Sequence, residues 1–117
     1  GLPQPEDQSA GLESVGVEDY LIRHPERTVF CRVRGDSMKD AGMLDGDMLV
    51  VERNRPTKPG DIVVAVVDNE LTVKHLYPLK GAAGWVLKPA NPDYPDIIAH
   101  QSLEVLGVVV GVFRRHD

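Results

Sequence analysis

Two β-type runs of this chain are separated by only two residues, and this spacing constrains the fold more than any other feature. The first run, DIVVAVV, covers residues 61–67 and is apolar on both faces, and the second, ELTVKHLY, covers residues 70–77. Asp68 and Asn69 join them, and both residue types tolerate the positive φ of a two-residue hairpin turn. The sequence therefore predicts an antiparallel hairpin whose first strand is central and buried on both sides.

The hairpin register predicts the surroundings of Lys74. Counting back from the turn pairs Val63 with Lys74 and Ala65 with Thr72, and cross-strand partners share a face. An amine in this mainly apolar setting loses hydration, which disfavours its charged form and lowers its pKa. A free lysine titrates at about 10.4, so a base that works near neutral pH needs a pKa lower by about 3 units. The register makes Lys74 a candidate general base.

The rest of the chain after residue 27 is also predicted to be mainly β. Valine-rich runs that alternate or are continuously apolar recur there, which favours a β-rich core. Gly107 and Gly111 in the last run are candidate points for a bulge or a bend. Besides the hairpin, the predicted strands cover residues 28–34, 47–53, 85–90 and 102–115.

The beginning of the chain has a different composition. Residues 1–16 are rich in Gly, Pro, Ser and acidic residues and predict a flexible or extended arm. Residues 17–24 predict about two turns of helix, which Pro25 ends. We therefore expect an arm with a short helix over residues 1–26 and a compact domain of twisted antiparallel strands over residues 27–117.

Composition excludes several classes of protein. The net charge of −5 argues against strong direct DNA binding, and the pair Arg114–Arg115 is too short to change this. The single cysteine, Cys31, can form no intramolecular disulfide and is expected to fill the core, which fits a reducing compartment. No run approaches the ~18 apolar residues of a membrane-spanning helix, and the start lacks a signal-peptide pattern. We expect a cytoplasmic protein without membrane attachment, metal or cofactor.

Ser37 follows a predicted strand end in the segment RGDSM, which begins at Arg34. The glycine of this segment lets backbone amides approach a reacting carbonyl closely. Serine alone is a weak nucleophile and needs a base. None of the four histidines has the surroundings of a triad member, and His75 is predicted to point away from the face that carries Lys74. Lys74 is therefore the better candidate base for Ser37.

Several segments together resemble the LexA/UmuD family of self-cleaving proteins, the S24 serine peptidases. GDSMKDAGMLDGDMLVVE resembles the family's active-site segment, TVKHL its lysine segment, and the spacing of 37 residues between Ser37 and Lys74 also fits. LKPANPDYPDI resembles the Pro-x-Asn-x-x-Tyr stretch of the family, and LEVLGVVVGVFR resembles its final strand. The resemblance runs from about Tyr20 to Arg115, and the combination of segments is what makes it specific.

The resemblance implies a fold and a set of roles. It implies a LexA/UmuD-like catalytic β-domain in which Ser37 attacks a peptide carbonyl, neutral Lys74 takes the proton of Ser37, and the backbone amides of Asp36 and Ser37 hold the oxyanion. The first residues, GLPQP, resemble those that follow the UmuD-type Cys–Gly cleavage point, so Gly1 is interpreted as a terminus made by self-cleavage. A LexA-type dipeptide at Ala10–Gly11 is the alternative cleavage point.

The resemblance also implies partners. A RecA filament on single-stranded DNA would promote cleavage during the SOS response, and the shortened product would form a homodimer. That homodimer would join a UmuC-type Y-family DNA polymerase in error-prone translesion synthesis. The apolar final run, residues 102–113, independently favours a homodimer, because an open strand edge of this composition invites aggregation.

Three other interpretations stay open. The chain could be the self-cleavage and dimerisation domain of a LexA-like or phage-type repressor, which an upstream helix-turn-helix would indicate. It could be a signal-peptidase-like Ser–Lys hydrolase acting on other proteins, which would need a membrane anchor. A non-catalytic β-barrel binding module would leave Ser37 far from Lys74.

Overall fold

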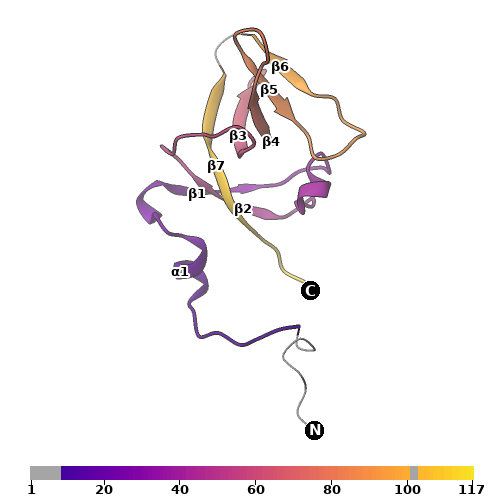
Figure 1. The fold of residues 1–117 in the computed structure, drawn as a ribbon. Coiled ribbons are helices and arrows are strands. Elements are labelled where there is room, and N and C mark those ends of the chain that lie inside the picture. The colour runs from indigo at the N-terminus through magenta and orange to yellow at the C-terminus, as the bar shows by residue number, and fades with distance from the viewer. Residues whose placement is uncertain (1–8, 101–102) are drawn as a thin grey trace.

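The computed structural model describes residues 9–100 and 103–117, and Figure 1 shows the fold. This part of the chain is mainly β, as predicted, and its seven strands form one curled antiparallel sheet with the order β1-β2-β7-β3-β4-β5-β6. No helix in these residues is long and apolar enough to cross a membrane. The strands are β1 (Thr28–Arg32), β2 (Met48–Glu52), β3 (Ile62–Val67), β4 (Glu70–Pro78), β5 (Trp85–Lys88), β6 (Ile97–Ala99) and β7 (Glu104–Phe113).

The predicted β3–β4 hairpin is confirmed with its register. Val63 pairs with Lys74, and the same register continues to the turn. Asp68 and Asn69 form that turn with φ values of 50° and 65°, the positive values that a tight hairpin requires. β3 lies inside the sheet between β4 and β7, which is the central position predicted from its apolar faces.

The last strand, β7, is not an open edge. Its second half pairs with β2 and its first half with β3, and Val108 pairs with both, so the strand lies between these two neighbours. Two breaks in its pairing register leave Leu106 and Val110 unpaired, each directly before one of the glycines predicted to mark a bulge or bend. The sequence-based argument for a homodimer treated this run as an edge strand, whereas the strand order places it between β2 and β3.

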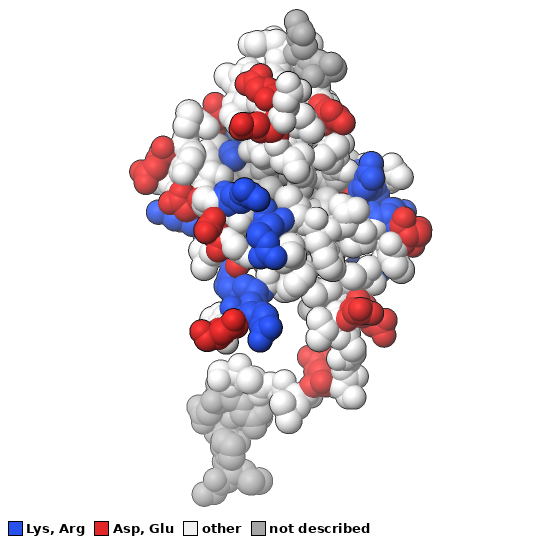
Figure 2. Space-filling view, turned by 180° about the vertical axis from the view of Figure 1, so that it is seen from behind, with Lys and Arg blue, Asp and Glu red and all other residues white. Residues whose placement is uncertain are grey.

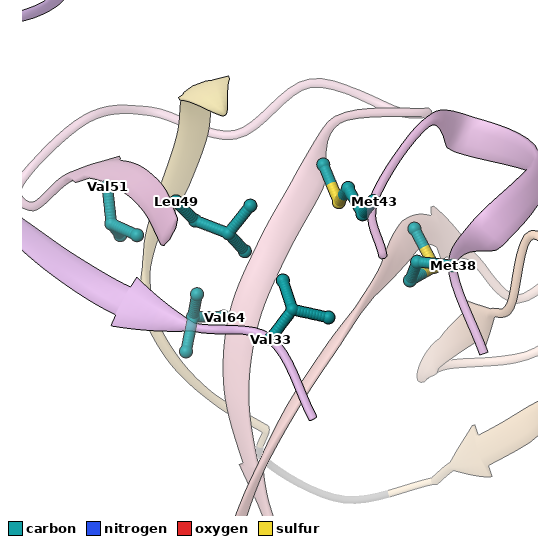
Figure 3. Close-up of a cluster of buried hydrophobic side chains, with 6 residues drawn as sticks. All are labelled: Val33, Met38, Met43, Leu49, Val51 and Val64. Carbon is teal, nitrogen blue, oxygen red and sulfur yellow. The ribbon is translucent and has the colours of Figure 1, made fainter. Parts of the chain in front are cut away.

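The curled sheet encloses two clusters of buried apolar side chains, one on each side of β3. Val64 points into the first cluster, whereas Val63 and Ala65 point into the second. Cys31 is partly buried against the first cluster, and burial raises the pKa of its thiol. Figure 3 shows the first cluster, which consists of Val33, Met38, Met43, Leu49, Val51 and Val64.

The chain before β1 has little regular structure. The helix α1 covers only Val17–Leu21, because Ile22 is already extended and a 3-10 turn, Pro25–Arg27, follows. Residues 9–16 are exposed, and α1 lies below the sheet in the view of Figure 1. The division of the chain at residue 26 stays a prediction, and Gly1 lies outside the described residues.

Several strand boundaries and one whole strand differ from the sequence-based prediction. β1 ends at Arg32, although its pairing register continues for one more residue, where the Val33 amide donates a hydrogen bond to the carbonyl of Asp47 at 2.8 Å. β5 ends at Lys88, just before Pro89, which cannot donate to a ladder. The three-residue strand β6 was not predicted, because so short a run carries no periodic signal.

Candidate active site

Ser37 lies in a turn that follows β1 and is anchored at both ends. Before it, Gly35 has a φ of +78°, and its amide donates a hydrogen bond of 2.7 Å to the carboxylate of Asp45. After it, the side chain of Met38 is buried in the first apolar cluster, and a 3-10 turn, Lys39–Ala41, continues the chain. The turn thus holds a partly exposed serine between two anchored ends.

The amine of Lys74 reaches this serine from β4. Its Nζ lies 3.0 Å from Ser37 Oγ, 2.9 Å from Thr72 Oγ1 and 3.1 Å from the carbonyl oxygen of Val73. Only 7% of Lys74 is exposed, and burial lowers the pKa of its amine. Within the part of the chain that the structure describes, no carboxylate lies within ion-pair distance of this amine.

The three neighbours of Lys74 Nζ fit both protonation states of the amine. An ammonium group has three N–H donors, and all three neighbours can accept. A neutral amine has two N–H donors and one lone pair, so it can donate to Thr72 and Val73 and accept the hydroxyl proton of Ser37. The site can therefore exchange a proton between the serine and the lysine without rearranging its heavy atoms.

A loop between β5 and β6 lies against the serine turn. The Ala90 amide donates to the Ser37 carbonyl oxygen at 2.9 Å, and the Asp40 amide donates to the Ala90 carbonyl oxygen at 2.9 Å. In Figure 1 this orange loop descends beside the magenta Lys39–Ala41 turn. These backbone bonds fix the position of the loop relative to the nucleophile.

Two side chains of the same loop contact Asp36. Asn91, which is 4% exposed, donates from Nδ2 to the Asp36 carbonyl oxygen at 2.9 Å and accepts from the Asp93 amide at 2.9 Å. Tyr94 donates its hydroxyl to Asp36 Oδ1 at 2.6 Å, and this hydrogen bond to a carboxylate raises the pKa of Tyr94. Both the main chain and the side chain of Asp36 are held by one loop.

The structure brings together the two side chains to which the sequence analysis gave roles and adds three to which it gave none. Ser37 and Lys74 are in contact, and the amides of Asp36 and Ser37 donate to no protein acceptor in the described ranges. Their oxyanion role stays a prediction. Sequence reasoning assigned no role to Thr72, Asn91 or Tyr94. Thr72 could have been found from its i−2 spacing to Lys74, which places both on one face of a strand.

The remaining candidate groups lie apart from this contact. His75 is partly buried, and its Nδ1 lies 3.0 Å from the carbonyl oxygen of Gly60. Residues 9–100 and 103–117 contain no group of three His, Cys, Asp or Glu side chains placed to hold a metal ion. The described part of the site thus offers a nucleophile, an amine base and free backbone donors, which suit attack on a carbonyl.

Comparison with known proteins gives a family match and two kinds of relative. The family model described as Peptidase S24-like matches residues 1–110. A LexA repressor from Acetivibrio thermocellus is 49% identical over 89 residues, which cover 75% of this chain and 41% of the relative. A LexA repressor from Opitutus terrae is 48% identical over 97 residues, which cover 82% and 47%. The chain therefore spans less than half the length of these repressors.

The second kind of relative matches over more of its length. Protein MucA from Salmonella typhimurium is 38% identical over 119 residues, which cover 99% of this chain and 79% of the relative. The match to MucA therefore extends through the N-terminal arm, whereas the two LexA matches leave 18% or more of this chain uncovered.

Proposed function

The chain belongs to the Peptidase S24-like family of self-cleaving serine peptidases, and from this membership we propose that Ser37 and Lys74 form its catalytic dyad. The observation that carries the proposal is the 3.0 Å separation between Ser37 Oγ and the buried amine of Lys74. A nucleophile within hydrogen-bond reach of a base is the arrangement that nucleophilic catalysis requires. Burial without a carboxylate partner supports a neutral, basic amine.

The proposed reaction begins with proton transfer. Neutral Lys74 takes the hydroxyl proton of Ser37 as Oγ attacks the carbonyl carbon of a peptide bond, which forms a tetrahedral intermediate. The carbonyl oxygen becomes negatively charged, and the amides of Asp36 and Ser37 donate hydrogen bonds to it. Donors of this kind act in a partly dehydrated site, where each contributes more than it does in water.

The second half of the reaction releases the cleaved segments. The intermediate collapses, the C–N bond breaks, and protonated Lys74 gives its proton to the leaving amine. This leaves an ester between Ser37 Oγ and the new carboxyl end of the substrate. Lys74, neutral again, takes a proton from water as the water attacks the ester carbonyl carbon. The bond between that carbon and Ser37 Oγ then breaks, Lys74 gives the proton to Oγ, and the new carboxyl end leaves.

We further propose that the cleaved protein serves as the homodimeric accessory subunit of a UmuC-type Y-family DNA polymerase in the SOS response. RecA filaments on single-stranded DNA would promote the cleavage. The match to MucA over 99% of this chain supports this UmuD-type assignment. A net charge of −5 supports protein partners over direct DNA binding, and on the face in Figure 2 the central basic side chains are bordered by acidic ones.

A LexA-like repressor domain is the second candidate function. The two LexA matches favour it by their identities of 49% and 48%, compared with 38% for MucA. The two functions differ in what the complete gene product does. A repressor binds a specific DNA operator, whereas a polymerase subunit co-purifies with a Y-family polymerase and shows no operator binding.

Self-cleavage of the complete gene product tests the dyad. The product with its upstream residues should cleave at alkaline pH, and Ser37→Ala and Lys74→Ala should each abolish cleavage, as measured by intact mass. Lys80→Ala, which changes an exposed lysine, is the matched control and should cleave at the wild-type rate. Cleavage of Lys74→Ala at the wild-type rate would rule out Lys74 as the base.

A further inference from the structure

The amide nitrogen of Ser37 and the carbonyl of Asp36 belong to one peptide group, and Asn91 holds that carbonyl. We propose that Asn91 is a positioning residue that aims the Ser37 amide at the oxyanion. The inference rests on the proposed dyad and on the proposed oxyanion role of this amide. Neither of these two proposals gives Asn91 a role.

Peptide planarity connects the two ends of this group. In a trans peptide the C=O and N–H bonds lie in one plane and point in opposite directions. A hydrogen bond that fixes the direction of the Asp36 carbonyl therefore also fixes the direction of the Ser37 N–H bond. Asn91 Nδ2 makes that hydrogen bond at 2.9 Å from the side opposite to the N–H bond.

Asn91 is itself held firmly enough to act in this way. Its Nδ2 is used by Asp36, its Oδ1 accepts from the Asp93 amide at 2.9 Å, and the side chain is buried. The preceding residue, Ala90, is bonded to the Ser37 carbonyl through its own amide. The peptide before Ser37 and the carbonyl after it are thus both fixed by two consecutive residues of one loop.

The hydrogen bond from Asn91 to the Asp36 carbonyl also makes the Ser37 N–H group a stronger donor. Hydrogen bonds in series polarise one another, so a peptide whose carbonyl accepts from Asn91 presents a stronger N–H donor. Tyr94 also holds the carboxylate of Asp36 with a hydrogen bond of 2.6 Å, which fixes the side chain of the residue that carries this carbonyl. The loop therefore both orients and strengthens the proposed donor.

Labelling of the 117-residue chain with a serine-directed fluorophosphonate tests this inference. Ser37 Oγ would attack phosphorus, the P–F bond would break, fluoride would leave, and Lys74 would take the serine proton. The phosphoryl oxygen then stands where the oxyanion would be. Two readouts follow: the labelling rate at the alkaline plateau, from intact mass, and the downfield shift of the Ser37 amide proton on labelling, from 1H–15N NMR.

Asn91→Asp is the first variant, because it keeps the acceptor for the Asp93 amide and removes the donor to Asp36. Loss of a whole oxyanion donor costs about 100-fold or more, so a misaimed donor should slow labelling about 10-fold and reduce the downfield shift. Asn54→Asp, the same change at an exposed turn position, is the control and should leave both readouts at wild-type values. If Asn91→Asp does not fold, Asn91→Leu takes its place in both measurements.

The outcomes separate this inference from the proposal beneath it. Wild-type labelling at Ser37 together with unchanged rates and amide shifts in the Asn91 variants would overturn the positioning role and leave the dyad intact. Failure of the wild type to label, or labelling that persists in Lys74→Ala, would overturn the dyad and the positioning role with it.

Discussion

Lys74 lies directly opposite Val63 across the β3–β4 hairpin, and Val63 is completely buried. The sheet therefore supplies the apolar surroundings that lower the pKa of the amine, while the serine turn supplies the hydroxyl it contacts. Burial of the amine and access to Ser37 depend on the same strand pairing. Changes to the hairpin should affect the fold and the proposed chemistry together.

The pKa of Lys74 leads to a prediction about pH. Only the neutral amine can accept a proton, so the rate of self-cleavage should rise with pH and level off below ~10.4, the ordinary lysine value. Lys74→Arg should be inactive at every pH, because a guanidinium stays protonated. Cleavage of the complete gene product, followed between about pH 6 and 11, checks this. A rate independent of pH over that range would contradict it.

Two glycines of β7 should differ in their tolerance of alanine. A Cβ at Gly107 would lie 2.6 Å from Val51 Cγ1 and 2.7 Å from the Glu52 carbonyl oxygen, and one at Gly111 would lie 3.5 Å from Leu21 Cδ2. Gly107→Ala should therefore lower the free energy of unfolding by about 2 kcal/mol or more, because backbone must move. Gly111→Ala, the matched control, should stay within about 0.5 kcal/mol of the wild type. Urea denaturation measures both, and equal effects would disprove the steric explanation.

Arg114 should stabilise the chain through the buried carboxylate of Asp47. Its Nε and Nη2 donate to that carboxylate at 2.7 and 2.6 Å, and these bonds lower the pKa of Asp47 from 3.8 to about 2. Arg114→Ala should lower the melting temperature by more than about 5 °C at neutral pH, because it leaves a buried charge unpaired. Arg115→Ala, at a 91% exposed side chain, is the control and should have little effect.

The same ion pair has a defined pH dependence. A carboxylate whose pKa is lowered in the folded state adds stability above its unfolded value, and this stability is lost as pH falls through the folded value. The difference in melting temperature between the wild type and Arg114→Ala should therefore shrink as pH falls from about 4 to about 2. If the difference in melting temperature stayed constant over this window, protonation of Asp47 would not be what removes the stabilisation by Arg114.

The homodimer stays a prediction, and the fold limits how it can form. Because β7 lies between β2 and β3 in the sheet, whereas β1 is an edge strand, a second copy could pair with β1 or contact side chains of β7. Phe30 and Phe113 form an exposed edge-to-face pair at 5.4 Å near that edge. Phe113→Glu should shift the protein toward monomer in sedimentation velocity, whereas Leu71→Glu, at another exposed apolar side chain, should not. A wild-type monomer at high micromolar concentration would contradict the prediction.

Much of the sheet could be predicted because its signals are local. Alternation with a period of two identifies strands, and a two-residue turn at Asp68–Asn69 fixes a register without knowledge of distant residues. That register alone placed Lys74 opposite Val63 in an apolar setting. The glycines of β7 were recognised as irregular points for the same reason, since glycine within a strand is itself a local signal.

The sequence by itself therefore determined the β class, the hairpin and the apolar setting of Lys74. Only the tertiary structure decided that β7 lies in the middle of the sheet and that Asn91 holds the peptide before Ser37. Asn91 contacts a residue 55 positions away, and Arg114 pairs with Asp47 across 67 positions. Such contacts follow no period and no turn rule; they arise where the curled sheet brings distant loops together, because buried polar groups must find partners there.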